Sequence, residues 1–413
     1  MTLIPVIVVS IVFILIAVRK IGKVKLKIWQ IMLLGAVAVF FTGQISPVSA
    51  AQSINPDVML FLFGMFIVGQ ALEQSGYLSH LSYRFFKRAK SIDSLTLFIL
   101  FGMGFASAFL LNDTLAIIGT PVVLSLAKKH DASQKVLLLT LAFAVTIGSV
   151  TSPIGNPQNL LIAINGNISN PFLAFFKFLL IPTIVNLFLA FGLLKIFYKN
   201  SFHKKALIHD QESIKDPALS RLCKISLILI VAAIVAKIIV VSFGLFDFRL
   251  TYVALIGSGP ILLLSQKRIE IVKKIDWHTL IFFASMFVLM ESVWETGFFQ
   301  GLITGSNLDV TSMPVIFGVS VILSQFISNV PLVALYLPLL LNVGVGEKAL
   351  IALAAGSTIA GNLFILGAAS NVIIIQNSEK KSGTTITFLE FAKIGIPLTI
   401  LNVLVYWLFL MFF

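Results

Sequence analysis

Long apolar runs separated by short polar loops make up most of the chain. A helix that crosses the hydrocarbon core of a bilayer needs about 20 predominantly apolar residues, and many of these runs approach that length. We therefore expect about ten membrane-spanning segments, five in each half of the chain. The expected spans are 3–18, 28–46, 57–75, 136–166, 171–197, 225–244, 250–265, 278–296, 348–377 and 386–412.

Two further apolar stretches, 94–127 and 313–345, are not explained by a single span. Basic residues flank the first stretch on both sides, and cationic loops stay in the cytoplasm. The first stretch should therefore enter and leave the membrane on one side, as a re-entrant hairpin with Asn112 at its tip. The second stretch has weakly charged flanks and is predicted to be a hairpin that opens to the outside, with Asn329 at its tip.

The positions of the Lys and Arg residues predict which loops face the cytoplasm. Basic loops follow the first and third spans and occupy the polar segment 199–224, which places the N-terminus outside. On this assignment the segments 1–198 and 225–413 each contain five spans and one hairpin, in opposite orientation. They are predicted to be inverted repeats, joined by the cytoplasmic linker loop 199–224.

The two hairpins also share their polar positions. The spacing from Asn112 to Pro121 equals that from Asn329 to Pro338. Paired Asn, Gly and Pro interruptions in two halves are the best sequence indication of a transporter's binding site. A broken helix survives in hydrocarbon only where it lines a cavity or is buried in protein, so the tips should lie at a central site.

A second repeated pattern falls in the spans that follow the hairpins. These spans are predicted to be broken helices, and their Thr, Gly and Asn positions have the same spacing in the two halves. The matched sets are Thr146, Gly155 and Asn159 in the first half, and Thr358, Gly367 and Asn371 in the second.

Hairpin tips and broken spans supply the ends of half-helices. N-terminal ends present free N–H groups that suit an anion, and C-terminal ends present carbonyls that suit a cation. Asn side chains add both a donor and an acceptor. The residues expected to bind the substrate are Asn112, Thr114, Asn156, Asn159, Ser328, Asn329, Ser370 and Asn371, and those expected to hold the coupling ion are Asp113, Asn112, Gly155, Asn329 and Gly367.

Asp113 is the one carboxylate expected at a hairpin tip. An ionisable residue within the membrane is a functional hypothesis by default. Three roles stay open: Asp113 is a ligand of Na⁺, it carries the coupling proton, or it is the N-cap of the half-helix that follows, a position that Asp favours.

Composition agrees with a membrane protein. Hydrophobic residues make up 58% and charged residues 11% of the 413 residues, and mean hydropathy is +1.03, whereas a soluble domain has about 25% charged residues. The formal charge of +13 resides in short loops, so no nucleic acid partner is expected. Cys223 is the single cysteine, which excludes an internal disulfide, and the histidines lack metal-ligand spacing. No cofactor is expected.

The motifs resemble those of the ion transporter superfamily, which includes arsenite efflux permeases, NhaD-type sodium/proton antiporters, citrate–metal symporters and divalent-anion/sodium symporters. Ser328-Asn329-Val330 keeps two residues of the Ser-Asn-Thr tips of the divalent-anion symporters. Asn112-Asp113-Thr114 is similar to the Asn-Asp tip of the arsenite and NhaD-type branch. Gly155-Asn156-Pro157-Gln158-Asn159 resembles a motif of anion permeases in that branch, and the resemblance covers nearly the whole chain.

The resemblance implies an all-α integral membrane fold: an inverted-repeat secondary transporter with about ten spans, two re-entrant hairpins and two broken helices. The implied function is ion-coupled transport of a small anion or oxyanion, of the arsenite, inorganic anion or carboxylate class, across the cell membrane, with no enzymatic activity. The expected partners are the lipid bilayer, the anion and Na⁺ or H⁺, and homodimerisation is left open.

Two alternatives remain. One is a Na⁺/H⁺ antiporter that moves no anion. The other, from a different class, is an intramembrane enzyme, which would need paired carboxylates or a His/Ser dyad at matching depth. The lone Asp113 supplies neither arrangement.

Overall fold

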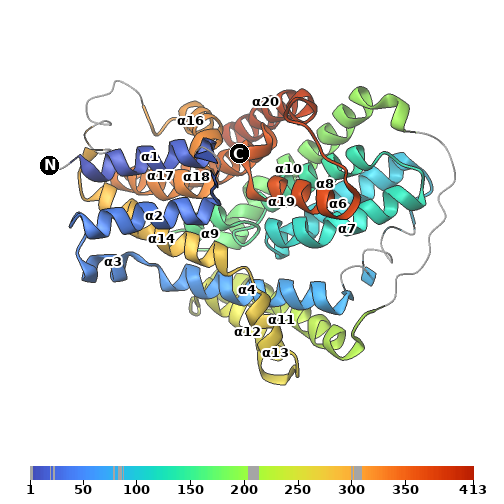
Figure 1. Ribbon diagram of the computed structural model, residues 1–413, viewed down its shortest axis with the longest axis horizontal. Coiled ribbons are helices and arrows are strands. Elements are labelled where there is room, and N and C mark those ends of the chain that lie inside the picture. Colours follow the sequence, from blue (N-terminus) through green and yellow to red (C-terminus); the bar gives the residue numbers. More distant parts are fainter. Residues whose placement is uncertain are drawn as a thin grey trace.

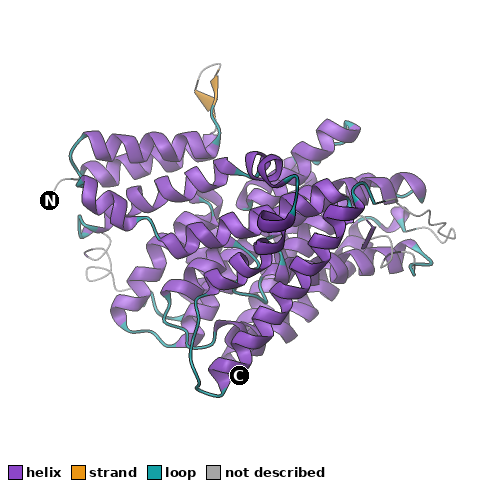
Figure 2. Cartoon of the chain, turned by 90° about the horizontal axis from the view of Figure 1, so that it is seen from below, coloured by secondary structure: helices purple, strands orange, loops and turns teal. Residues whose placement is uncertain are grey.

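The protein is described by a computed structural model that covers residues 3–18, 20–21, 24–77, 80–81, 86, 88–202, 214–298, 301 and 309–413. Figures 1 and 2 show an almost entirely helical molecule, and Figure 2 shows a short strand pair that projects from the helical body. This pair joins Lys20–Ile21 (β1) to Val24–Lys25 (β2). The expected all-α membrane fold is confirmed.

The helices of the first half follow the expected spans closely. The predicted hairpin is divided into α6 and α7, and the predicted broken span into α8 and α9. The helices are α1 (Ile4–Val18), α2 (Ile28–Phe41), α3 (Pro47–Ser53), α4 (Pro56–Ser75), α6 (Ile92–Phe109), α7 (Asn112–Lys129), α8 (Gln134–Ser149), α9 (Pro157–Asn165) and α10 (Pro171–Phe197), followed by the 3₁₀ turn η1 (Lys199–Ser201).

The second half repeats this order. Its hairpin is α16 and α17, and its broken span is α18 and α19 with two 3₁₀ turns between them. The elements are α11 (Pro217–Ser242), α12 (Leu250–Leu264), α13 (Arg268–Lys274), α14 (Trp277–Trp294), α16 (Met313–Ile327), α17 (Asn329–Val343), α18 (Glu347–Ile359), η2 (Ala360–Asn362), η3 (Ile365–Gly367), α19 (Ala369–Ser382) and α20 (Phe388–Phe412).

Many helices present an apolar outer surface. Six of the described helices are long and apolar enough to cross a membrane by length and composition. Large apolar side chains on their outer faces are exposed, including Phe176 on α10, Ile228 on α11 and Ile400 on α20. In water such a surface would be costly, whereas lipid tails are an equivalent apolar solvent.

The two halves are interleaved, and corresponding helices have corresponding neighbours. Helix α2 packs on α14, and its counterpart α12 packs on α4. In the hairpins, α7 packs on α8 and α19, and its counterpart α17 packs on α18 and α9. Helices α10 and α20 pack on each other (Figure 1). Each hairpin therefore lies between the broken helix of its own half and that of the other half.

Polar contacts join helix ends that were predicted to lie on the same side of the membrane. On the predicted cytoplasmic side, Lys195 at the end of α10 pairs with Asp93 at the start of α6, at 2.6 Å. On the opposite side, Asn55 before α4 donates to Asn165 at the end of α9, at 3.0 Å. The relative sidedness of these ends therefore agrees with the charge pattern.

Some boundaries differ from the sequence prediction. Helix α11 begins at Pro217, inside the predicted linker, because Asp216 caps it by accepting from the Leu219 N–H at 3.0 Å. This N–H and the Lys267 ammonium, 2.7 Å away, hold the pKa of Asp216 below its usual range. Helices α3 and α13 occupy segments that were expected to be loops. The start of α11 is amphipathic and projects beyond the apolar span, which hydrophobicity alone does not detect. The domain boundaries stay a prediction.

A close backbone approach joins α6 to α8. A Cβ on Gly148 would collide with the backbone of Gly104, and beside this contact the Ser107 hydroxyl donates to the Val145 carbonyl at 2.7 Å. The first hairpin is thus held directly against the broken helix of its own half.

We predict that Gly148→Ala destabilises the protein by about 1–3 kcal/mol, the usual cost of overpacking. Gly192→Ala on α10 is the matched control, because a Cβ there meets nothing within 4 Å and Ala is favoured over Gly in a helix by about 1 kcal/mol. Thermal aggregation in detergent, followed by size-exclusion chromatography, measures both. Equal midpoints for the two variants would contradict the close α6–α8 contact.

Candidate functional site

The break between α8 and α9 is held together by its own Asn side chains. Asn156 caps α9 by accepting from the Asn159 N–H at 2.8 Å. The Asn159 amide donates to the carbonyls of Ser149 at 3.2 Å and Ser152 at 3.1 Å. Gly155 passes so close to the Ser149 backbone that a Cβ would collide with it. The carbonyls freed at the end of α8 are thereby satisfied without water.

The first hairpin tip docks on this break. The Asn112 N–H donates to the Gly155 carbonyl at 2.9 Å, and the Asn112 side chain accepts from the Asp113 N–H, also at 2.9 Å. Thr114 faces α4 at Gly69, where a Cβ would lie 2.6 Å from the Thr114 methyl group. Three of the expected residues, Asn112, Gly155 and Asn156, are thus adjacent.

Thr358, in the last turn of α18, connects the two halves. Its hydroxyl accepts from the side-chain amides of Asn156 at 3.1 Å and Gln158 at 3.4 Å, and it donates to the Asn159 side-chain carbonyl at 3.1 Å. All four side chains are buried. The C-terminal end of α18 is therefore tied to the N-terminal end of α9 by a fully used hydroxyl.

The break between α18 and α19 is tied differently. The Asn371 amide donates to the Gly361 carbonyl at 2.6 Å, which corresponds to the Asn159–Ser149 bond of the first half. Gln325, near the end of α16, donates to the Ala360 carbonyl at 2.9 Å. A Cβ on Gly367 would lie 2.7 Å from the Gln325 side-chain oxygen, so the second hairpin lies against this break.

The second tip is strained where the first is relaxed. Ser328, between α16 and α17, has φ +70° and ψ 158°, whereas Leu111 at the first tip has φ −54° and ψ 136°. A non-glycine residue in such a conformation costs about 1–3 kcal/mol and is typical of functional sites. The adjacent Asn329 is buried, and its side-chain oxygen has no hydrogen-bond partner among the described residues.

Unpartnered buried oxygen atoms gather around the second hairpin and the second break. Native proteins satisfy most buried polar groups, so such a concentration needs an explanation. In this region the unpartnered oxygen atoms belong to Ser320, Ser324, Gln325, Asn329, Asn362, Ser370 and Asn371.

Asp113 is the one charged residue among the expected site residues, and it is half-buried in the first turn of α7. The N-cap of α7 is Leu111, so the expectation that Asp113 is the cap is wrong. The chain leaves α6 in an extended conformation at Leu110 and Leu111 before α7 begins, which shifts the cap toward the N-terminus. Asp113 still lies at the positive end of the α7 dipole.

The structure brings together most but not all of the expected residues. Asn112, Gly155, Asn156 and Asn159 form one connected network, and Gly367 adjoins the second hairpin. Among the described residues, no hydrogen bond joins Asn112 to Asn329. Hydrogen bonds instead connect the first tip, through the first break, to Thr358 of the second half.

Several polar residues of this region were not among the expected site residues. Thr358 and Gln158 belong to the repeated motifs but were not predicted to be site residues. A further repeated signal, Thr-Ile-x-Asn, occurs on α10 and α20. Its four polar residues, Thr183, Asn186, Thr399 and Asn402, are buried. Asn402 accepts from the Asn362 amide at 2.9 Å and so contacts the second break.

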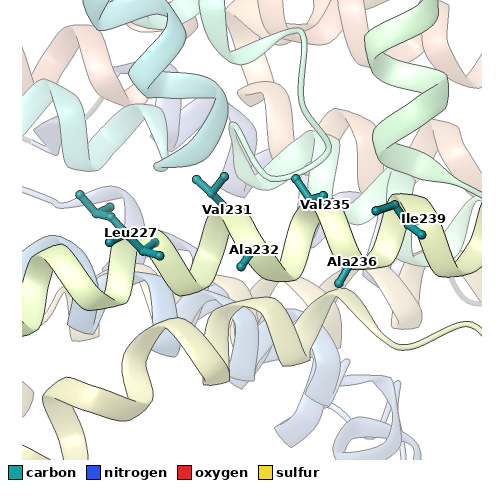
Figure 3. A pocket seen from close by; sticks show the side chains of 7 residues that line it. Leu227, Val231, Ala232, Val235, Ala236 and Ile239 are labelled. Carbon is teal, nitrogen blue, oxygen red and sulfur yellow. The ribbon is translucent and has the colours of Figure 1, made fainter.

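A surface groove on α11 has a different character. Figure 3 shows it lined by side chains of α11 such as Val231, Val235 and Ile239, all of them apolar. A polar solute would find no partner there. The groove is consistent with contact to lipid, and it is not a candidate for the functional site.

Comparisons with known proteins agree with a membrane transporter. The sequence profile of the citrate transporter family matches residues 11–349. The chain belongs to this family, and it is a multi-pass membrane transporter.

Relatives along nearly the full length are transporters as well. An uncharacterized transporter of Mycobacterium tuberculosis is 29% identical over 95% of this chain and 94% of its own. The silicon efflux transporter of rice, Oryza sativa, is 25% identical over 89% of each chain. A putative arsB transporter of Dictyostelium discoideum is 23% identical over 90% of this chain and 85% of its own. The predicted resemblance to the ion transporter superfamily is confirmed.

Two solved structures share the fold. The YdaH transporter of Alcanivorax borkumensis superposes with a TM-score of 0.54 at 14% identity, over 99% of this chain and 97% of its own. The MtrF protein of Neisseria gonorrhoeae superposes with a TM-score of 0.51 at 13% identity, over 98% and 93%. At this identity the likeness concerns the fold alone.

We predict that Thr358→Val lowers the free energy of unfolding by about 1–3 kcal/mol, because it leaves buried amide groups without a partner. Thr140→Val is the control, since the Thr140 hydroxyl donates within its own helix to the Val136 carbonyl and little should change. Thermal unfolding of the purified variants measures the difference. If both variants are equally stable, the Thr358 network does not hold the halves together.

Proposed function

We propose that this chain is an ion-coupled secondary active transporter of a small anion or oxyanion. The observation that carries the proposal is the meeting of both hairpins with both helix breaks around buried, neutral polar groups. The family's description as citrate transporters supports a small oxygen-rich anion.

Four half-helices begin in this region, at Asn112, Pro157, Asn329 and Ala369. Their N-terminal N–H groups and dipoles favour an anion. The expected substrate-binding side chains Asn112, Asn156 and Asn329 lie at or just before three of these starts. We assign Asn112 and Asn329 to the anion, together with Thr114 and Ser328. The amides of Asn156 and Asn159 are occupied within the first break, and Ser370 and Asn371 belong to the second break.

Four half-helices also end in this region, and their carbonyls favour a cation. We propose that the coupling ion is Na⁺ or H⁺ and that Asp113 is its principal partner. Asn112, Gly155, Asn329 and Gly367 supply neutral oxygen atoms at the tips and breaks. No cofactor is proposed.

We further infer that the N-terminus lies outside and that the open ends of α6 and α7 face the cytoplasm. The inference rests on the basic residues around these ends, Lys90, Lys128 and Lys129. A cysteine at position 128 in a Cys223→Ser background, labelled by an impermeant reagent from each side of the membrane, tests it. Labelling from the outside would reverse the assignment.

The alternative of a Na⁺/H⁺ antiporter that moves no anion is favoured by one observation, since Asp113 is the only charged residue among the proposed site residues. A cation exchanger needs a carboxylate, whereas it does not need the additional Asn and Ser side chains at four helix starts. The anion transporter accounts for both.

Purified protein in liposomes tests the function directly. Arsenite, sulfate, phosphate, citrate and dicarboxylates are offered in turn under imposed Na⁺ or H⁺ gradients. We expect gradient-driven uptake of one of these solutes, reduced about tenfold or more in Asn329→Ala, because losing a hydrogen bond to a charged group costs about 1.5–3 kcal/mol. If Na⁺ and H⁺ exchange while no anion moves, the antiporter is correct and the proposal fails.

We predict that Asp113→Asn disturbs ion coupling more than stability, because Asn keeps the shape but carries neither charge nor exchangeable proton. If Asp113 binds Na⁺, half-maximal uptake should need about tenfold more Na⁺, which corresponds to about 1.4 kcal/mol. If it carries a proton, the pH dependence of uptake should flatten. Unchanged Na⁺ and pH dependence would remove Asp113 from the coupling site.

A further inference from the structure

The two helix breaks have equivalent positions but different side chains. When Thr146 is matched to Thr358 and Asn159 to Asn371, the same spacing matches Ser149 to Gly361, Asn156 to Ala368 and Gln158 to Ser370. Each of these three residues is smaller in the second half. The second break therefore lacks several side-chain atoms that fill the first.

The consequence is seen at the two threonines. The Thr358 hydroxyl is satisfied by the amides of Asn156 and Gln158 and by the Asn159 carbonyl. The corresponding Thr146 hydroxyl has no partner among the described residues. Ala368 and Ser370, which replace Asn156 and Gln158 at the second break, have no side-chain amide to donate to it.

Three oxygen atoms are left unpartnered around the second break. They belong to the side chains of Thr146, Ser370 and Asn371, which are 1%, 0% and 1% exposed. The Asn371 amide nitrogen is already used by the Gly361 carbonyl, so its remaining oxygen can only accept. The two hydroxyl groups can both donate and accept.

These residues share a neighbourhood. A Cβ on Gly361 would lie 3.3 Å from the Thr146 methyl group and 2.7 Å from the Ala368 Cβ. Asn371 reaches the same residue through its hydrogen bond to the Gly361 carbonyl, and α8 packs on α19. Thr146, Ala368 and Asn371 therefore all lie next to Gly361. Ser370 is matched by the repeat to Gln158, whose amide contacts Thr358, the counterpart of Thr146.

We propose that one buried water molecule binds here and bridges Thr146, Ser370 and Asn371. Buried waters typically make about three hydrogen bonds to groups that would otherwise be unsatisfied. Thr146 lies in the last turn of α8, a carbonyl end, whereas Ser370 and Asn371 lie in the first turn of α19, an N–H end. A ligand that both donates and accepts suits this mixed site better than an ion of either sign.

The two contacts between the halves therefore differ in how they are bonded. The Thr358 contact consists of direct bonds from three side chains. The Thr146 contact is mediated by water, which can rearrange without breaking a protein–protein bond. The inference does not depend on which solute is transported.

Experimental structures of the wild-type protein, determined with Na⁺ and with choline as the cation, test the site. We expect a density peak within about 2.7–3.2 Å of the three oxygen atoms in both conditions. A peak that appears only with Na⁺ would identify a cation site and overturn the proposal. The absence of a peak in both conditions would overturn the proposal as well.

Two variants of similar size test the same site by stability, without a transport assay. Ala368→Asn restores the amide present at Asn156, so it should displace the water, donate to Thr146 and keep or raise the Tm. Ala368→Leu should displace the water and leave the oxygens unpaired, so its Tm should fall. Equal Tm changes for the two variants would contradict a polar site, and a failure of the proposed anion transport would leave these outcomes unaffected.

Discussion

An interrupted helix inside a membrane protein must find partners for its freed backbone groups without bulk water, and the centre of this molecule is organised by that constraint. The first break meets it with the protein's own side chains. Asn159 covers the end of α8, Asn156 covers the start of α9, and Gly155 receives the first hairpin tip. The elements that interrupt the helix are thus the elements that hold the hairpin in place.

The second break meets the same constraint incompletely. Gln325 and Asn371 satisfy two of its carbonyls, but the Asn329 side-chain oxygen has no partner among the described residues and Ser328 is strained. Unsatisfied and strained groups raise the free energy of this conformation, so they lower the cost of reaching another one. The strain and the unpaired side-chain oxygen are therefore concentrated at the second hairpin tip.

Most of the fold could be predicted because it depends on apolar length and on repeated spacing. The predicted span 171–197 is helix α10 (Pro171–Phe197), and the hairpins and breaks fall at the expected positions. Contacts between the halves could not be predicted, because hydrophobic patterns do not specify which helix packs on which. Thr358 was visible as a matched residue, but its three partners follow only from the approach of α18 to α9. The start of α11 was missed because Asp216 acts through a local cap rather than through hydrophobicity.

The small number of charged residues in the site gives a reason why anion transport would be coupled to a cation. Each break places a positive helix end beside a negative one, so the helix ends add no net charge and Asp113 is the one formal charge among the proposed site residues. In the proposed function an anion would share this region with a carboxylate. Two like charges about 8 Å apart repel by about 2 kcal/mol at an effective dielectric constant of about 20. A bound Na⁺ or a proton on Asp113 removes that repulsion. The two candidate coupling ions are therefore alternative solutions to one electrostatic problem, and either would make anion binding conditional on cation binding.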